Sequence, residues 1–379
     1  MSSSSSRSLV TARTRGGTAS PRLTALLAAL LALGLALAAA CAPAGAPAGG
    51  AAAPAGRSAA APASAPDAPR ADTAPASPAA PEPLQVGLLP GSVFQWGTYA
   101  AMEQGFYTAE GIAPDVIQIG TPNDAARAVV SNSVPVAHYS VDAAVRAIEN
   151  GGNLVVVGSE ISNPAFSLIV QPEIPDYAGL RGKSIAVSAP KDGAAVVLRL
   201  WLRTKGLGED DYDFASVGTT PNRYAALKTR AADAAIMTQP LDFKAMSEGF
   251  RLLGRSTDVL QQFVYMNISA NKDWAREHRA ELVRYLRGLG AGIDWLYDPA
   301  NKEAAIQLLM ERTKTDHDAV SKTYTVYIEE GKVLPRHAEV SLPGLETFLK
   351  AMVDLGDLPA TAADPLRYVD PSFVEEAKR

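Results

Sequence analysis

Short apolar runs alternate with longer amphipathic stretches along the chain after residue 83. The run LQVGLL (84–89) ends at Pro90-Gly91, and the stretch 96–111 that follows has apolar residues at helical spacing and stops at Gly111. Further strands are predicted over 114–119, 134–140 and 153–160, and helices over 122–132 and 141–152. Because strands that alternate with such helices form parallel α/β units, this part predicts one α/β lobe.

The same alternation returns further along the chain. Strands are predicted over 183–188, 213–218 and 233–238, and helices over 192–206, 221–231 and 240–249. The run 166–171 predicts a strand that leaves the first lobe, and 263–271 predicts one that returns to it. Helical patterns then cover 272–298, 300–313, 316–329 and 342–355.

The predicted fold class is therefore α/β, with two similar lobes joined by two crossings. Each lobe has a mixed, mainly parallel sheet flanked by helices. The predicted boundaries are 84–170 plus 266–379 for lobe 1 and 171–265 for lobe 2. Two lobes also suit the length, because 296 residues exceed what one ordinary core holds.

The first 83 residues follow a different pattern. Four arginines precede an uncharged run, 23–40, that is rich in Leu and Ala and ends next to Cys41, the only cysteine of the chain. This order of basic, apolar and small residues is typical of a secretory signal. A transmembrane anchor is the alternative, since eighteen residues just reach across a bilayer, but the weakly apolar poly-Ala end favours the signal.

The stretch before Cys41 resembles a bacterial lipoprotein signal, in which a peptidase cuts before a cysteine that then carries lipid. That pattern prefers Leu three residues before the cysteine, where this chain has Ala38, with Leu37 one position earlier. The resemblance implies a signal peptide over 1–40, diacylglycerol on the Cys41 sulfur and a third acyl chain, such as palmitate, on its amine. Two or more chains give stable anchoring, so we expect an extracytoplasmic protein held by lipid at the cell membrane.

Residues 42–83 consist almost wholly of Ala, Pro, Gly and Ser, and with Cys41 they form the predicted segment 41–83. They offer few large apolar side chains to bury, so we expect a disordered tether. Removing residues 1–40 takes away four basic residues and no acidic one, which leaves a formal charge of −9. This balance argues against nucleic acid as a partner.

Signs of catalysis are weak. The four histidines, at 138, 278, 317 and 337, lack metal-ligand spacing, and the chain has no Gly-x-Ser-x-Gly elbow and no phosphate loop. We therefore predict that the protein is not an enzyme and that it needs no cofactor and no metal.

Three stretches carry a resemblance to a known family. They are AMEQGFYTAEGIAPDVIQIG (101–120), YAGLRGKSIAVSAPKDG (177–193) and LKTRAADAAIMTQPLDFKAMSEGFRLLG (227–254). Over about 84–355 the chain resembles the solute-binding proteins of ABC importers with the type II periplasmic-binding-protein fold. The branch groups binders of nitrate, sulfonate, taurine and thiamine-pyrimidine precursors. A yeast-type pyrimidine synthase shares this fold but carries a cysteine-rich iron-site motif, which is missing here.

The resemblance implies that the protein captures a small organic solute between its lobes and delivers it to an ABC permease with its ATPase. We expect a monomer. The alternative is a ligand-sensing lipoprotein that presents bound solute to a membrane receptor.

Candidate ligand contacts follow the strands, because ligands of open α/β sheets sit beyond the carboxyl ends of strands and at helix N-termini. In the first lobe, GSVFQWGT (91–98) offers Ser92, Gln95 and Trp96, and Trp96 either stacks on the solute or packs in the core. The stretch HYSVD (138–142) offers Tyr139 and Ser140. Ser140 caps the next helix, contacts the solute or does both, and we interpret His138 as structural.

In the second lobe, Asp192 and Gly193 begin a helix whose N–H groups suit a carboxylate, sulfonate or phosphate. Alternatively, Asp192 caps the helix and repels an anion. The other candidates in this lobe are Thr220 and Asn222 of GTTPN (218–222), and Thr238 and Gln239 of TQPLD (238–242). Asp242 is expected to be solvated, or to face the helix dipole near a helix start, rather than to contact the ligand. Arg199, Arg203 and Lys205 are expected to be solvated.

The first-lobe loops contain no Arg or Lys. This favours a neutral, flat or aromatic solute stacked on Trp96 over an anion held only by helix N-termini.

Overall fold

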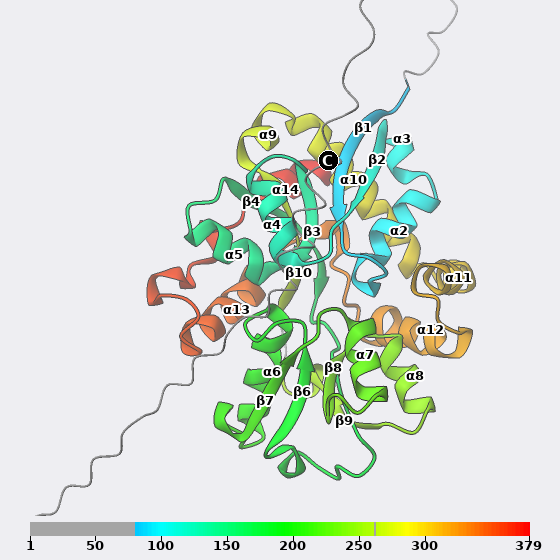
Figure 1. The fold of residues 1–379 in the computed structure, drawn as a ribbon. Coiled ribbons are helices and arrows are strands. Elements are labelled where there is room, and N and C mark those ends of the chain that lie inside the picture. Colours follow the sequence, from blue (N-terminus) through cyan, green and yellow to red (C-terminus); the bar gives the residue numbers. More distant parts are fainter. Residues whose placement is uncertain (1–79, 261–262) are drawn as a thin grey trace, which may run out of the picture. The chain divides into compact units, whose positions relative to one another are not determined.

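The computed structural model describes residues 80–260 and 263–379, which form part of one compact unit of the chain (Figure 1). The predicted signal peptide, the lipidation site Cys41 and almost all of the predicted tether lie outside the described residues. Within these ranges, no helix has both the length and the apolar character that crossing a membrane requires.

The first sheet has five strands in the order β2-β1-β3-β10-β4. Strand β1 pairs in parallel with β2 and β3, whereas β10 inserts antiparallel between β3 and β4. All eight residues of β10 are buried. The bounds are β1 Glu82–Leu88, β2 Ile112–Gln118, β3 Val136–Ser140, β4 Leu154–Ser162 and β10 Val264–Asn271.

The second sheet also has five strands, in the order β7-β6-β8-β5-β9. Strand β6 pairs in parallel with β7 and β8, and β5 pairs antiparallel with β8 and β9. The bounds are β5 Ser167–Val170, β6 Lys183–Val187, β7 Tyr212–Ser216, β8 Ala234–Met237 and β9 Arg251–Arg255. The two sheets repeat one arrangement, in which a single strand, β10 or β5, lies antiparallel to both of its neighbours.

Helices flank both sheets, as the alternating pattern predicted (Figure 1). The helices of the first sheet are α2 Trp96–Glu103, α3 Phe106–Ala109, α4 Pro122–Val130, α5 Val141–Glu149, α9 Lys272–Glu277, α10 Arg279–Tyr297 and α14 Ser372–Ala377. The helices of the second sheet are α6 Gly193–Thr204, α7 Thr220–Lys228 and α8 Leu241–Ser247. The segment after α10 adds α11 Lys302–Thr313, α12 His317–Tyr324 and α13 Leu342–Asp354.

Three predicted helices differ in detail. The helix expected over 96–111 is divided into α2 and α3 at Gly105, whose backbone is left-handed. The helix expected over 272–298 is divided at His278, whose backbone leaves the helical region and ends α9. The helix expected over 316–329 is α12 followed by a π-helical turn, Thr325–Glu330. Short 3₁₀ helices occur at Val93–Gln95, Ala178–Leu180, Glu209–Asp211, Ser256–Asp258, Pro299–Asn301, Arg336–Ala338, Ala360–Ala363 and Pro365–Arg367.

The predicted lobe boundaries differ from the strand pairing at both crossings. Residues 264–265 were assigned to lobe 2, but they begin β10 of the first sheet. Residues 167–170 were assigned to lobe 1, but as β5 they pair only with strands of the second sheet. The chain therefore leaves the first sheet after β4 and enters the second with β5. We use "first lobe" and "second lobe" below for the two sheets with their helices, and the boundaries of the lobes as folding domains remain a prediction.

A buried polar network ties the first sheet to its helices. The His138 Nδ1 atom lies 2.6 Å from Glu160 Oε2, and His138 Nε2 lies 2.8 Å from the Tyr285 hydroxyl. Glu160 also accepts the Thr98 N–H of α2 at 2.8 Å. Tyr285 in turn stacks on Tyr107, with the ring centroids 4.8 Å apart. His138 thus has the structural surroundings that the sequence favoured.

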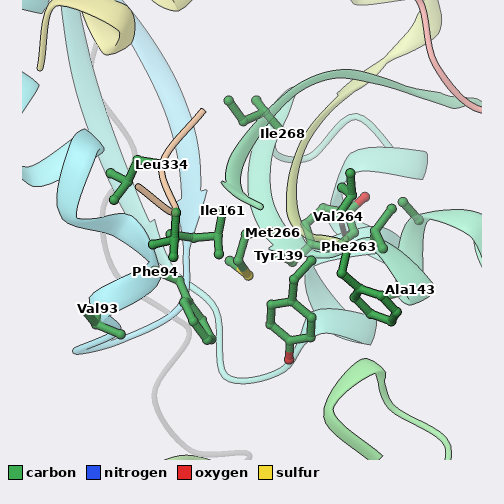
Figure 2. Close-up of a cluster of buried hydrophobic side chains, with 14 of the residues drawn as sticks. Val93, Phe94, Tyr139, Ala143, Ile161, Phe263, Val264, Met266, Ile268 and Leu334 are labelled. Carbon is green, nitrogen blue, oxygen red and sulfur yellow. The ribbon is translucent and has the colours of Figure 1, made fainter. Parts of the chain in front are cut away.

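Around this network the core of the first lobe is apolar. Figure 2 shows Ile161, Val264, Met266 and Ile268 of strands β4 and β10 among these side chains. The rings of Phe94 and Tyr139 lie at one edge of the group, and the Tyr139 hydroxyl points away from the other labelled side chains.

Trp96 belongs to the packing of the first lobe. Its side chain is wholly buried, its Nε1–H donates to the Ala305 carbonyl at 3.2 Å, and its ring meets Tyr324 edge-on at 5.9 Å. Trp96 therefore holds the start of α2 against α11 and α12. The loss of a buried aromatic ring leaves a cavity and an unpaired carbonyl.

We predict that Trp96→Ala lowers the free energy of unfolding by about 3–5 kcal/mol. Chemical denaturation followed by circular dichroism measures this change. Leu366→Ala is the control, because Leu366 is the one large apolar side chain found exposed among the described residues, and its removal should change stability by less than about 0.5 kcal/mol. Equal effects of the two substitutions would contradict the packing role of Trp96.

Candidate functional site

Buried polar atoms without a hydrogen-bond partner gather where the two lobes meet. Within the described residues they include Asp142 Oδ1, the Ser140 hydroxyl, and Nε and Nη1 of Arg223. The hydroxyls of Tyr139 and Tyr327 and Oε1 of Gln239 are also unpaired. Buried polar groups are nearly always paired in folded proteins, so these atoms mark a candidate site for a bound molecule.

Asp142 lies in the first turn of α5 and faces the second lobe. Only 2% of the residue is exposed. A Cβ atom on Gly193, the first residue of α6, would lie 2.6 Å from Asp142 Oδ1 and 3.0 Å from the ring of Tyr265. Glycine is therefore required at 193 for the backbone of the second lobe to approach Asp142 this closely.

Burial, together with the negative charge of Asp192, raises the pKa of Asp142 from its ordinary value near 4 to about 7. Asp192 itself caps α6, because its two carboxylate oxygens accept the N–H groups of Ala195 at 2.8 Å and Ala189 at 3.2 Å. The capping alternative for Asp192 is thus what the geometry shows. Its charge still acts on the groups around it.

Arg223 lies in α7 and is only 4% exposed. Its Nη2 donates to Thr220 Oγ1 at 2.6 Å, and Thr220 Oγ1 lies 3.0 Å from Thr238 Oγ1. Burial lowers the pKa of the guanidinium from its ordinary value, and the charge of Asp192 opposes this shift. Because an arginine stays protonated in proteins, Arg223 presents a positive charge with two unpaired nitrogens.

Tyr265, near the start of β10, lies between these groups. The charges of Asp192, Asp142 and Arg223 all act on its hydroxyl, and burial raises its pKa well above the ordinary value. We call Tyr265, Asp142, Asp192, Gly193 and Arg223, with Thr220 and Thr238, the Tyr265 cluster.

An aromatic group borders the Tyr265 cluster. The Tyr265 ring lies 5.2 Å from Phe94 and 4.9 Å from Phe166, and the rings of Phe94 and Phe166 are 5.7 Å apart. Phe94 follows β1, and Phe166 lies on the crossing between β4 and β5. The site therefore combines an apolar aromatic side with a strongly charged side.

A second polar group lies beside the π-helical turn. Asp242 is wholly buried and accepts hydrogen bonds from Ser167 Oγ at 2.7 Å and Gln239 Nε2 at 2.8 Å. Arg255 is 3.7 Å from the same carboxylate, and the charges of both residues act on Tyr327. Asp242 is therefore not solvated, and it takes the other position that the sequence left open, in the first turn of α8 near the start of the helix.

The structure distributes the sequence-predicted residues unevenly. Tyr139, Ser140, Asp192, Gly193, Thr220 and Thr238 lie in or beside the Tyr265 cluster, and Gln239 lies in the adjoining group. Asn222 is exposed, although its neighbour Arg223 is buried.

In the loop 91–98 of the first lobe, the three candidate side chains make local contacts, whereas the sequence had led us to expect contacts with the solute. Ser92 accepts the Phe94 N–H at 3.2 Å, and the Gln95 amide lies 2.9 Å from the Tyr99 hydroxyl. With Trp96 in the core, the side chains of this loop are engaged in local packing, and we omit Ser92, Gln95 and Trp96 from the site proposed below.

Three functional candidates escaped the sequence reasoning: Asp142, Arg223 and Tyr265. For Arg223 a signal existed, because it precedes Ala226 and Leu227 by three and four residues, and all three are buried on one face of α7. An arginine within an apolar helix face requires a partner. The stretch considered from the sequence, GTTPN, ended one residue before it.

A separate ion cluster joins the lobes beside the Tyr265 cluster. Asp357, which follows α13, is almost fully buried and pairs with Arg199 of α6 at 2.5 Å. Arg146 of α5 and Lys191 lie 3.6 and 3.5 Å from the same carboxylate. The expectation that Arg199 is solvated was wrong, because Asp357 covers it.

Other hollows of the described residues lie elsewhere. A groove of about 850 Å³ runs along α4 and α5, and a cavity of about 580 Å³ lies beside the π-helical turn. Neither is lined by Asp142 or Arg223. No group of three or more His, Cys, Asp or Glu side chains suited to a metal ion occurs in the ranges that the structure describes.

This architecture, two mixed sheets flanked by helices with buried charges between two lobes, is the periplasmic-binding-protein fold. Solved structures with the same fold include the nitrate-binding protein NrtA of Synechocystis PCC 6803, with a TM-score of 0.66 and 16% identity over 79% of this chain and 89% of that one. The alkanesulfonate-binding protein SsuA of Xanthomonas axonopodis pv. citri, bound to MOPS, has a TM-score of 0.63 and 16% identity over 76% and 98%. The aliphatic sulphonate binding protein SsuA of Escherichia coli has a TM-score of 0.61 and 18% identity over 77% and 93%.

The chain belongs to the family described as NMT1/THI5 like, whose model matches residues 95–302, more than half of the sequence. The matched region contains Asp142, Arg223 and Tyr265. No curated protein matches the chain.

The raised pKa of Asp142 predicts a pH-dependent stability. A carboxyl group with a higher pKa in the folded state stabilises the fold below the unfolded value near 4, and this contribution is lost as the pH rises through about 7. We expect Asp142→Asn to be more stable than the unsubstituted protein at pH 8, by at most about 4 kcal/mol, and similar to it at pH 4.

Thermal unfolding between pH 4 and pH 8 measures this difference. The control is Asp318→Asn, because Asp318 occupies the first turn of α12 but is exposed. Parallel pH profiles of Asp142→Asn and the unsubstituted protein would show that Asp142 does not carry the shift.

Proposed function

We propose that this protein is the extracytoplasmic solute-binding component of an ABC importer. It captures a small organic solute at the Tyr265 cluster and delivers it to a permease. The observation that carries the proposal is Arg223, a buried cation with two unpaired nitrogens at the meeting of the lobes. The fold shared with nitrate-binding and sulphonate-binding proteins supports it.

Both lobes contribute to the cluster, so a solute held there bridges them. Asp142 comes from the first lobe, Arg223 and Gly193 come from the second, and Tyr265 stands near the start of the returning strand. A molecule that satisfies groups on both sides binds the closed arrangement better than an open one. Closure of this kind is how solute occupancy becomes readable by a membrane partner.

Arg223→Ala should weaken binding of the solute that the protein retains from its host. Truncating one partner of a buried, charged hydrogen bond weakens binding by about 2–5 kcal/mol, or roughly 30-fold to several thousand-fold. Isothermal titration calorimetry with the released solute measures the change. Arg230→Ala is the matched control, since Arg230 follows the same helix but is exposed and pairs with Glu173. Unchanged affinity in Arg223→Ala would remove the Tyr265 cluster as the binding site.

An uptake experiment distinguishes a component of an importer from a ligand-sensing lipoprotein. Deletion of the gene in the host should abolish accumulation of the labelled solute if the protein serves an importer. Normal accumulation with a lost response to the solute would favour the receptor-linked alternative.

We also propose that lipid on Cys41 holds the protein at the cell membrane. Cys41→Ser should prevent labelling with a palmitate analogue and release the protein or leave it uncleaved, because the modified thiol is missing. Gel fluorescence of labelled cells, with fractionation into membrane and soluble parts, measures both effects. Continued labelling of the serine variant would contradict the lipid anchor.

A further inference from the structure

Two opposite charges stand in the Tyr265 cluster without pairing with each other. Asp142 and Arg223 both act on the Tyr265 hydroxyl, yet no ion pair within 4.0 Å joins them in the part of the chain that the structure describes. Oδ1 of Asp142 and Nε and Nη1 of Arg223 are buried and unpaired. Each charge therefore needs a partner of its own.

The threonines next to Arg223 add a further donor. Thr220 Oγ1 accepts from Arg223 and shares a hydrogen bond with Thr238 Oγ1. Whichever hydroxyl donates in this bond, one hydroxyl hydrogen of the pair is left over. Together with the guanidinium N–H groups, it forms a set of donors that suits the oxygens of an acid group.

The acidic side of the cluster excludes a simple anion as the whole solute. A lone anion at Arg223 would leave Asp142 unpaired and would bring a third negative charge near Asp142 and Asp192. A neutral solute can hydrogen-bond to both Asp142 and Arg223, but it compensates neither buried charge. A molecule with a donor nitrogen and an acid group satisfies both, which compensates the desolvation of each buried charge.

Resting on the proposed function, we propose that the solute is a small zwitterion. Its acid group binds Arg223 and the Thr220–Thr238 pair, and its protonated nitrogen binds Asp142. Because both charges act on one tyrosine, we expect a short spacer between the two groups of the solute. Phe94 and Phe166 lie on the apolar side of the site, against the Tyr265 ring.

This assignment revises the expectation of a neutral, flat solute stacked on Trp96. That expectation rested on the first-lobe loops, which contain no cation. The cation comes from the second lobe, and Trp96 is occupied in the core.

Native mass spectrometry of the protein purified from its host tests the assignment through the exact mass and fragments of any retained solute. We expect a solute with a basic nitrogen and an acid group. A retained solute that lacks either group would overturn the zwitterion assignment and leave the binding function standing. If the protein retains no solute and no probe of the panel below shifts its melting temperature, both the function and the assignment fail.

The probe panel pairs zwitterions with their deaminated acids. It comprises 2-aminoethanesulfonate with ethanesulfonate, 3-aminopropanoate with propanoate, and 4-aminobutanoate with butanoate, together with nitrate and sulfate. For the best-bound pair we expect the amino compound to bind at least about 100-fold more tightly, on the scale of a buried charged hydrogen bond. Equal or tighter binding of the deaminated acid would overturn the assignment.

The variant Asp142→Asn tests recognition of the solute's nitrogen without disrupting the fold. It should reduce the preference for the amino compound to less than about tenfold, since an amide offers no negative charge, while the fold stays intact. Asp318→Asn should keep the full preference. An unchanged preference in Asp142→Asn would show that another group binds the nitrogen and would overturn the role of Asp142.

Discussion

Both lobes depend on the way in which strand β10 enters the first sheet. It runs antiparallel between β3 and β4, and side chains add to its ladder: Asn267 donates to the Tyr139 carbonyl at 2.9 Å and Ser159 donates to the Met266 carbonyl at 3.0 Å. A strand bonded on both sides and buried along its whole length cannot shift its register without disrupting the sheet. Tyr265, near the start of this strand, is therefore held in place, and the groups of both lobes are arranged around a fixed ring.

The buried charges around the Tyr265 ring cost free energy as long as they have no hydrogen-bond partners. Burying a guanidinium and a carboxylate away from water is costly, and hydrogen bonds compensate it only where partners exist. The structure supplies some of these partners, such as Thr220 for Arg223 and the α6 N–H groups for Asp192. It leaves others open on both sides of Tyr265. If solute binds at this site as proposed, selectivity follows from the unpaired groups, because a molecule that lacks one of the two charges leaves a buried group without a partner.

The alternation of strands and helices could be predicted from the sequence, because period and length distinguish the two kinds of element. Its return further along the chain, together with the length, also predicted two lobes, and the family resemblance agreed. Whether an individual side chain points into the core or toward the other lobe could not be predicted in the same way. Every residue from Trp96 to Ala101 is buried, so α2 has no polar face in this stretch to reveal which side meets the core. Strand β5 was placed in the wrong sheet because a short, fully apolar strand has the same pattern in either sheet.

The candidate site, too, could be predicted from the sequence only in part. The search along loops after strands led to Tyr139, Ser140, Asp192, Thr220 and Thr238, which lie in or beside the candidate site. Arg223 was missed because helix-start signals draw attention to capping residues rather than to the first full turn. Asp142 was missed for a related reason, since an acidic residue in a first turn is ordinarily a dipole-stabilising and solvated one. Only the packing of α6 against α5 turns it into a buried charge.

Asp357 gives the C-terminal segment a role of its own in this arrangement. Its carboxylate neutralises Arg146 of the first lobe together with Arg199 and Lys191 of the second, yet it lies outside the Tyr265 cluster. If solute binds at the Tyr265 cluster as proposed, a change at this position alters how firmly the lobes hold together without altering which chemical groups the solute must carry. Affinity then depends on the segment after α13 and selectivity on α5 and α7, so the two properties can evolve separately.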